Sequence, residues 1–166
     1  MFQINDTVLY GAEGVFRITD TTQMDFLGEK KDYFVLESLS DGKSAVYVPM
    51  WNESMLAKMR RILSKEEIYE IIKAMPDEEL IWIDDENQRL VEYKEILLKG
   101  DHREIIKLIK TLYIHKEKQK AVGKNLHKVD EKFLKDAEKL LHDEFAYVLE
   151  IKPEQVVPFI QQRIKL

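Results

Sequence analysis

The spacing of apolar residues changes once along the chain, near Ser64, and this change limits the folds that the chain can adopt. Before it, β-branched and aromatic runs alternate with turn residues at short intervals, which is typical of strands. Leu27-Gly28-Glu29 and Asp41-Gly42 fall between such runs, and Asp-Gly readily adopts the positive φ angles of a hairpin turn. We therefore predict a small antiparallel sheet or barrel for residues 1–62. The clearest strand runs are Thr7–Tyr10, Val15–Thr19, Tyr33–Glu37 and Ala45–Val48.

From Ser64 onward the apolar residues follow a helical period. Ser64-Lys65-Glu66-Glu67 has the form of a capping box, which predicts a helix that runs to about Ala74. Asp77–Leu98 is predicted as the next helix. Gly100-Asp101 then supplies a helix end and the N-cap of the following helix. The apolar face of the second helix is formed by Leu90, Tyr93 and Leu97.

Two apolar stripes and a proline mark the remaining helices. Lys116–Lys128 lacks a stripe and contains Gly123, so it is predicted as a helix end followed by a loop. Pro153 suits the first turn of a last helix. We therefore predict a compact all-helical domain for residues 63–166. For the whole chain we predict an α+β fold of two domains, 1–62 and 63–166. The first stripe is Ile105, Leu108, Ile109, Leu112 and Tyr113, and the second is Phe133, Leu134, Ala137, Leu140, Leu141, Phe145, Val148 and Leu149.

Some predicted strands are apolar on both faces. Tyr33-Phe34-Val35-Leu36 and Val46-Tyr47-Val48 do not alternate as a strand with one solvent-exposed face should. A cover is therefore needed for the second face. Two covers are consistent with the sequence: the helical half of the same chain, or another protein that docks there.

The residue types exclude several kinds of chemistry. The 166-residue chain has no cysteine, which excludes disulfides, thiolate metal sites, iron–sulfur clusters and a cysteine nucleophile. Its six glycines form neither of the common phosphate-binding loops, and its four histidines lack the four-residue spacing of zinc hydrolases. Asp84 and Glu86 could begin a calcium loop, but Arg89 occupies the position that requires glycine. We expect no cofactor and no metal site.

The chain contains no stretch close to the roughly 20 consecutive apolar residues that span a bilayer. Its first residues, Met1–Asp6, lack the basic and apolar regions of a secretory signal. We therefore expect a cytoplasmic protein that does not associate with membranes.

The net charge of −5 is unevenly distributed along the chain. Residues 102–142 carry 11 basic and 6 acidic residues, whereas residues 63–101 carry 5 and 12. A lysine run of this kind is either a solvated face or a surface for nucleic-acid phosphates. An acidic protein can thus present one basic face. The lysines in question are Lys116, Lys118, Lys120, Lys124, Lys128 and Lys132.

An ordered set of motifs resembles a known family. The run from Asp6 to Val15, Asp-Thr-Val-Leu-Tyr-Gly-Ala-Glu-Gly-Val, resembles the opening strand and turn of CarD-type bacterial transcription regulators and of the matching module in transcription-repair coupling factors. The resemblance covers Phe2 to about Val148. Its further motifs are Gly28, Tyr33-Phe34-Val35-Leu36, Val48-Pro49, Arg89, Glu95, Leu97, Gly100-Asp101 and the stripe ending at Leu112.

This resemblance implies a Tudor-like N-terminal domain that pairs with the β-subunit lobe of RNA polymerase, largely through strand-edge contacts. It also implies a helical domain that faces promoter DNA in the minor groove, with weak sequence specificity, and it implies no enzyme activity. The arginines that many relatives present to the polymerase fall near Met24 and Tyr47, which are uncharged. We place Met24, Phe26, Val46 and Tyr47 on the polymerase-binding side.

In the family, a tryptophan near the start of a DNA-contacting helix wedges into the minor groove at the upstream edge of the transcription bubble. Aligned on Gly100-Asp101, that position falls nearest Glu86, so Trp82 lies four residues early. Trp82 is therefore either the same wedge on a longer helix or a core residue. The expected DNA-facing residues are Trp82, Arg89, Lys124, Lys128 and Lys132.

The leading hypothesis is a monomeric transcription regulator that binds RNA polymerase and stabilises the open complex, in the cytoplasm at the nucleoid. One alternative is a protein–protein adaptor outside transcription, with the lysines merely solvated. Another is a small hydrolase, which would need a pocket that collects histidines and carboxylates.

Overall fold

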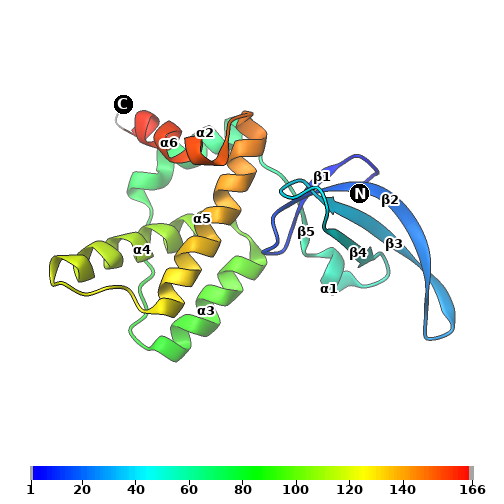
Figure 1. Cartoon of the computed structure of the whole chain (residues 1–166), viewed down its shortest axis with the longest axis horizontal. Helices are drawn as coiled ribbons and strands as arrows, with labels where there is room; N and C mark the ends of the chain where they lie inside the picture. Colours follow the sequence, from blue (N-terminus) through cyan, green and yellow to red (C-terminus); the bar gives the residue numbers. More distant parts are fainter. Residues whose placement is uncertain (1, 165–166) are drawn as a thin grey trace. The chain divides into compact units, whose positions relative to one another are not determined.

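The computed structural model describes residues 2–164 (Figure 1), which divide into two compact units between Ile62 and Leu63. We term residues up to 62 the sheet unit and residues from 63 onward the helical unit. The predicted α+β class is confirmed, with a Tudor-like antiparallel sheet followed by helices. Each unit has its own apolar core.

The sheet unit is one five-stranded antiparallel sheet with the strand order β4-β3-β2-β1-β5. Its core consists of apolar residues from one face of the sheet, among them Phe16, Ile18, Phe34, Leu36 and Val48. Figure 1 shows the long β2–β3 hairpin that dominates the unit. The strands are β1 (Thr7–Tyr10), β2 (Val15–Phe26), β3 (Glu29–Ser38), β4 (Ala45–Pro49) and β5 (Met59–Arg61), and a short helix α1 (Glu53–Leu56) precedes β5.

The β2 strand continues seven residues beyond the predicted Thr19 and contains a bulge at that residue. Ile18 pairs with Leu36, but Asp20 pairs with Val35, so the register shifts by one residue across the bulge. A one-residue shift moves every later side chain to the other face of the sheet. The rest of β2 therefore presents its even-numbered residues on the face opposite the core.

The helical unit begins as the capping signals predict. Ser64 caps α2 (Lys65–Ala74) by accepting from the Glu67 amide at 3.1 Å. Gly100 ends α3 in the left-handed conformation at φ 68°, and Asp101 caps α4. The remaining elements are η1 (Met75–Asp77), α3 (Glu86–Lys99), α4 (His102–Ala121), α5 (Lys128–Leu149), η2 (Pro153–Gln155) and α6 (Val156–Ile164).

The predicted helix from Asp77 is wrong in its first part. The α3 helix begins only at Glu86, with Asp85 as its N-cap, and residues 78–85 lead into it without regular structure. Leu90, expected on the buried face, is 37% exposed, and Arg89 takes the buried position with Tyr93 and Leu97. The i, i+4 spacing of these three residues places them on one side of the helix.

Candidate functional site

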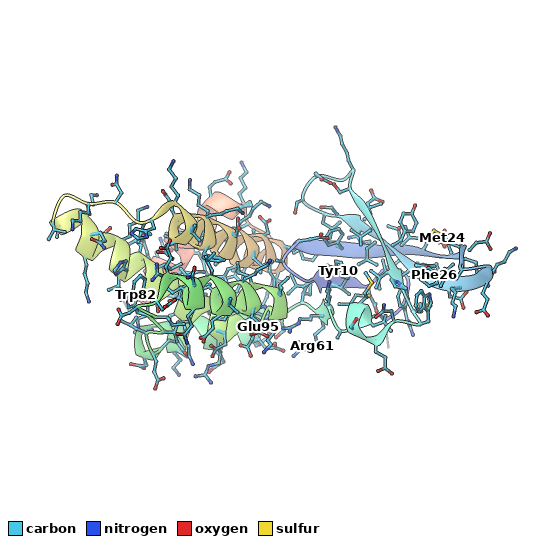
Figure 2. The ribbon with its side chains drawn as sticks, turned by 90° about the horizontal axis from the view of Figure 1, so that it is seen from below. Tyr10, Met24, Phe26, Arg61, Trp82 and Glu95 are labelled. Atoms are coloured by element: carbon cyan, nitrogen blue, oxygen red, sulfur yellow. The ribbon has the colours of Figure 1, made fainter. Side chains whose placement is uncertain are left out.

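The face of the sheet opposite the core carries three of the four residues predicted to bind a protein. Met24, Phe26 and Tyr47 are 36%, 42% and 49% exposed, and Figure 2 shows Met24 and Phe26 on the outer part of the β2–β3 hairpin. Their cross-strand partners are Lys31, Glu29 and Val35, all on β3. Val46 differs, because it pairs with Leu36 and its side chain packs on the core cluster.

Trp51 covers part of this outer face from within the sheet unit. Its ring lies 4.8 Å from that of Phe26 and meets Tyr33 edge-on at 6.4 Å, between ring centroids. The Lys31 ammonium group lies 5.0 Å from the centroid of the same indole. These contacts form a partly exposed aromatic cluster, the kind of surface that is enriched in protein interfaces.

The β4 strand is one of the two edge strands of the sheet and has main-chain groups that face away from it. Ser38 donates to Ser44 and Met50 donates to Asp32, which fixes the alternation of hydrogen-bonded pairs along β3 and β4. By this alternation Val46 bonds to Leu36, whereas the N–H and C=O of Ala45 and Tyr47 point outward. No strand in the described part of the chain pairs with this edge. An extended segment of a partner can add there.

The β2–β3 turn holds an apolar side chain in solvent. Leu27 and Gly28 form a two-residue turn with φ angles of 52° and 84°, and Leu27 is 90% exposed. Two successive positive φ values define the hairpin turn that favours Asn-Gly, so leucine is costly at the first position. A leucine kept there under strain is a further candidate contact that the sequence did not single out.

In the helical unit, residues 78–85 carry Trp82, and we term them the strap. The strap has no regular secondary structure at Trp82, and α3 begins only at Glu86, so the tryptophan is not a wedge on a longer helix. Its side chain is partly buried against the core that contains Tyr93 and Leu108, and its Nε1 donates to Asp84 Oδ1 at 3.0 Å. Figure 2 shows Trp82 toward the end of the unit that bears the α4–α5 loop, drawn in yellow.

Two side chains from neighbouring helices lie on the Trp82 indole. The imidazole of His115 stacks on it with 3.8 Å between centroids and 19° between planes. The Arg89 guanidinium lies 4.4 Å from the indole centroid. Burial lowers the pKa of His115 from its ordinary 6.5, and Asp130 opposes this shift. The neutral imidazole is therefore favoured in the stack at neutral pH.

Arg89 is buried and does not face solvent, which corrects its expected contact with DNA. Its side chain is 4% exposed, and its guanidinium forms a bidentate pair with Asp130, with Nε–Oδ1 at 3.1 Å and Nη2–Oδ2 at 2.9 Å. Its remaining nitrogen donates to the carbonyls of Ile83 and Asp84 at 3.0 and 3.1 Å. Arg89 therefore holds the strap instead of reaching a phosphate.

The predicted lysines surround the same end of the helical unit. Lys124 lies in the α4–α5 loop, and Lys128 and Lys132 lie in the first turns of α5; all three are exposed. Lys132 forms an ion pair with Asp136 at 2.8 Å, so it is only partly available to a ligand. His127, in the same loop, lies 3.6 Å from Glu86 at the start of α3. The exposed lysines thus lie beside the elements that hold Trp82.

Several residues of these sites were not found from the sequence. Asp130 and Thr111 are ordinary members of predicted helices, and their roles depend on partners 41 and 30 residues away. The sequence does not distinguish Trp51 from a core residue, and only its ring contacts place it on the outer face. Within residues 2–164, the structure has no cluster of three or more potential metal ligands and no helix long and apolar enough to cross a membrane.

Comparison with known families covers both units. A model described as "CarD-like/TRCF RID domain" matches residues 2–63. A second model, described as "CarD, C-terminal domain", matches residues 67–161. Among curated proteins, none matches the chain significantly. The two matches occur in the order that the sequence motifs indicated.

Proposed function

Since the chain belongs to the CarD-type family of transcription-associated proteins that interact with RNA polymerase, we propose a specific division of labour between its two units. The sheet unit binds the β-subunit lobe of RNA polymerase. The helical unit contacts promoter DNA at the upstream edge of the bubble and stabilises the open complex. The family's domains are regulatory and interaction domains rather than enzymatic ones. The protein acts as a monomer in the cytoplasm, at the nucleoid.

The outward main chain of β4 supports the polymerase contact. Ala45 and Tyr47 offer an antiparallel edge, and beside it the outer face carries Val35 opposite Tyr47 and the charged Glu37 opposite Ala45. Because Met24 and Tyr47 are uncharged where many relatives have arginine, strand addition and apolar contact carry this interface. Binding to the isolated lobe should therefore depend only weakly on salt, unlike an interface of ion pairs.

The position of Trp82 supports the DNA contact and is the observation on which it mainly rests. An indole that is partly buried, held on two sides and set beside exposed lysines suits a rigid wedge against a base step. Wedging into the minor groove costs a few kcal/mol of unstacking. That cost is offset when the protein slows re-closure of the melted strands. Lys124 and Lys128 would contact the adjacent phosphates.

The test is the lifetime of the open complex on a promoter, measured with wild-type protein, with Trp82→Ala and without protein. We expect Trp82→Ala to bind the β-subunit lobe normally and to lose most of the lifetime extension. Tyr113→Ala is the matched control, since Tyr113 is an exposed aromatic on α4 at 55% exposure. An unchanged lifetime with Trp82→Ala would remove this residue from the site. Absence of lobe binding by the wild type would favour an adaptor outside transcription.

A further inference from the structure

The strap that carries Trp82 has no regular secondary structure, yet side chains of α3 and α4 hold its main chain in place. At its start, Lys110 Nζ donates to the carbonyls of Pro76 and Glu78, each at 2.8 Å. Arg103 forms an ion pair with the buried Glu78 carboxylate at 3.0 Å. At its end, Arg89 donates to two carbonyls, as described above. The strap is therefore anchored at both ends.

Its middle is held at Ile81, the residue directly before Trp82. The Ile81 amide donates to Thr111 Oγ1 at 2.9 Å, and the Ile81 carbonyl accepts from the Tyr93 hydroxyl at 2.8 Å. The main-chain N–H and C=O of Ile81 are thus both hydrogen-bonded to side chains of other elements. Thr111 and Tyr93 are 2% and 0% exposed, so water cannot easily replace either bond.

The direction of each hydrogen bond is fixed by the surroundings. The Thr111 hydroxyl donates to the Lys107 carbonyl at 2.6 Å, which turns its lone pair toward the Ile81 amide. Burial raises the pKa of Tyr93 to about 12, so its hydroxyl stays protonated and remains a donor at physiological pH. The two bonds therefore persist across the pH range in which His115 titrates.

Each helix contributes two residues to the arrangement, four positions apart. On α4, Thr111 holds the main chain of Ile81 and His115 stacks on the ring of Trp82. On α3, Tyr93 holds Ile81 and Arg89 lies against the indole. Residues at i and i+4 share one side of a helix. One side of each helix thus contacts both the main chain of Ile81 and the ring of Trp82.

We propose that Thr111 and Tyr93 are positioning residues for Trp82 and that they set how well the indole wedges into DNA. This inference rests on the proposed function of Trp82. If either bond is lost, the Ile81 peptide can rotate and the indole no longer keeps its place on His115. DNA would then have to order the wedge as it binds, and the open complex would be shorter-lived.

The experiment uses the full chain with three substitutions at the two positions. Thr111→Val keeps the size of the side chain and removes the hydroxyl, Thr111→Ser keeps the hydroxyl, and Tyr93→Phe removes only the phenolic oxygen. Tyr69→Phe is the matched control, because Tyr69 packs on Phe159 in the same unit and away from the strap contacts. Thermal unfolding verifies that each variant is folded.

Two readouts separate positioning from general stability. The chain has two tryptophans, so its nitrogen–proton NMR spectrum shows two indole signals, and Trp82→Phe identifies the one from Trp82. We expect Thr111→Val and Tyr93→Phe each to shift the Trp82 indole signal and to shorten the open-complex lifetime about fivefold, as loss of one hydrogen bond would. Thr111→Ser should restore both values, and Tyr69→Phe should change neither.

Three results would overturn the inference. The first is a folded Thr111→Val protein with the wild-type indole signal and lifetime. The second is a Thr111→Ser protein as impaired as Thr111→Val. The third is a shifted indole signal with an unchanged lifetime, when Trp82→Ala does shorten it. If Trp82→Ala itself has no effect, the proposed function fails instead, and the indole signal still decides whether Thr111 and Tyr93 position the ring.

Discussion

The two units differ in what they bury. In the described part of the sheet unit, Ser38 is the one buried polar residue, and the core is otherwise apolar. The helical unit buries four charged side chains together with Thr111. Each has a partner: Arg89 binds Asp130, Glu78 binds Arg103, and Glu144 binds His102 at 2.5 Å and the Leu63 amide at 2.9 Å. The charged residues are Glu78, Arg89, Asp130 and Glu144.

The difference follows from how each unit provides hydrogen-bond partners for its main-chain N–H and C=O groups. Strand ladders pair most backbone groups of the sheet unit, so its side chains can be apolar within and its edge can remain open to a partner. The helical unit must hold the strap, whose main chain lacks such a ladder, and buried polar side chains supply its hydrogen bonds. The sheet unit therefore leaves the outward edge of β4 unpaired within the described residues, while the helical unit uses side chains to hold the segment that carries Trp82.

The largest expected effect is on the buried ion pair. Asp130→Ala should lower the free energy of unfolding by about 3–5 kcal/mol, because it leaves the Arg89 guanidinium buried without its carboxylate. Denaturant unfolding measures this loss. Lys132→Ala is the control, since it removes an exposed ion pair on the same helix and should cost about 0.3–0.5 kcal/mol. A cost below about 1 kcal/mol for Asp130→Ala would contradict the role given to the pair.

Replacing both residues of the Arg89–Asp130 ion pair separates its effect on stability from its effect on Trp82. Arg89→Met combined with Asp130→Leu should recover much of the lost stability, because apolar residues of similar size tolerate burial without the desolvation of two ions. The carbonyls of Ile83 and Asp84 would still lose their donor. The double variant should therefore be stable yet show a shifted Trp82 indole signal. A native signal would mean that the pair serves stability alone.

The next largest effect concerns the apolar core of the sheet unit. Leu36 is fully buried, so Leu36→Ala should cost about 2–5 kcal/mol and weaken binding to the polymerase lobe. Each unit contains one tryptophan, Trp51 or Trp82, so the two indole signals report on the units separately. We expect the Trp51 signal to change and the Trp82 signal to stay. Equal changes in both would contradict the separateness of the cores.

A smaller effect of opposite sign is expected at the β2–β3 turn. Leu27→Asn should raise the free energy of unfolding by about 0.5–1 kcal/mol, because asparagine tolerates the left-handed conformation better than leucine. The same change should weaken binding to the β-subunit lobe, since it removes a 90% exposed apolar side chain. Thermal unfolding and lobe binding measure the two effects. Greater stability with undiminished binding would assign Leu27 no part in the interface.

The exposed lysines should make the DNA affinity of the protein depend on salt concentration. Each DNA phosphate neutralised contributes about 0.9 to the slope of log affinity against log salt concentration. Lys124→Gln and Lys128→Gln should each reduce the slope by about that amount in a DNA-binding titration. Lys139→Gln is the control, because this exposed lysine pairs with Asp143 farther along α5. If the slope is unchanged in a variant that combines Lys124→Gln with Lys128→Gln, these lysines form a solvated face that does not contact DNA phosphates.

The smallest effect should be the pH dependence of the helical unit. The pKa of His115 is lowered by burial, raised by Asp130 and lowered again by Arg89, Lys118 and His127. The unfolded state therefore binds more protons than the folded state below pH 6.5, and stability is lost as the pH falls from 6.5 through the folded pKa. Burial acts on His142 in the same direction.

Denaturant unfolding of the wild type and of His115→Gln, at a series of pH values below neutrality, isolates this contribution. The variant should lose less stability on acidification than the wild type, and the remainder belongs to His142 and the carboxylates. The Trp82 indole signal should titrate with His115 in the wild type, because the two rings stack. Identical pH profiles for the two proteins would exclude His115 as a contributor.

Local signals in the sequence were sufficient for the fold class and for the ends of several helices, but not for the start of α3 or the length of β2. The serine at position 64 and the Gly100-Asp101 step act on backbone groups within one turn, so their effects can be read from adjacent residues. Motif order was likewise enough to indicate the family, which the two family matches then confirmed.

Only the tertiary structure decided which side chains share a face or a site. The bulge at Thr19 shifts the alternation of β2 and so puts Met24 and Phe26 opposite the core, while Val46 lies on the core side. The burial of Arg89 depends on Asp130, 41 residues away, and the strap depends on partners from two other helices. Such pairings are set by packing between distant segments, and no pattern within a few residues specifies them.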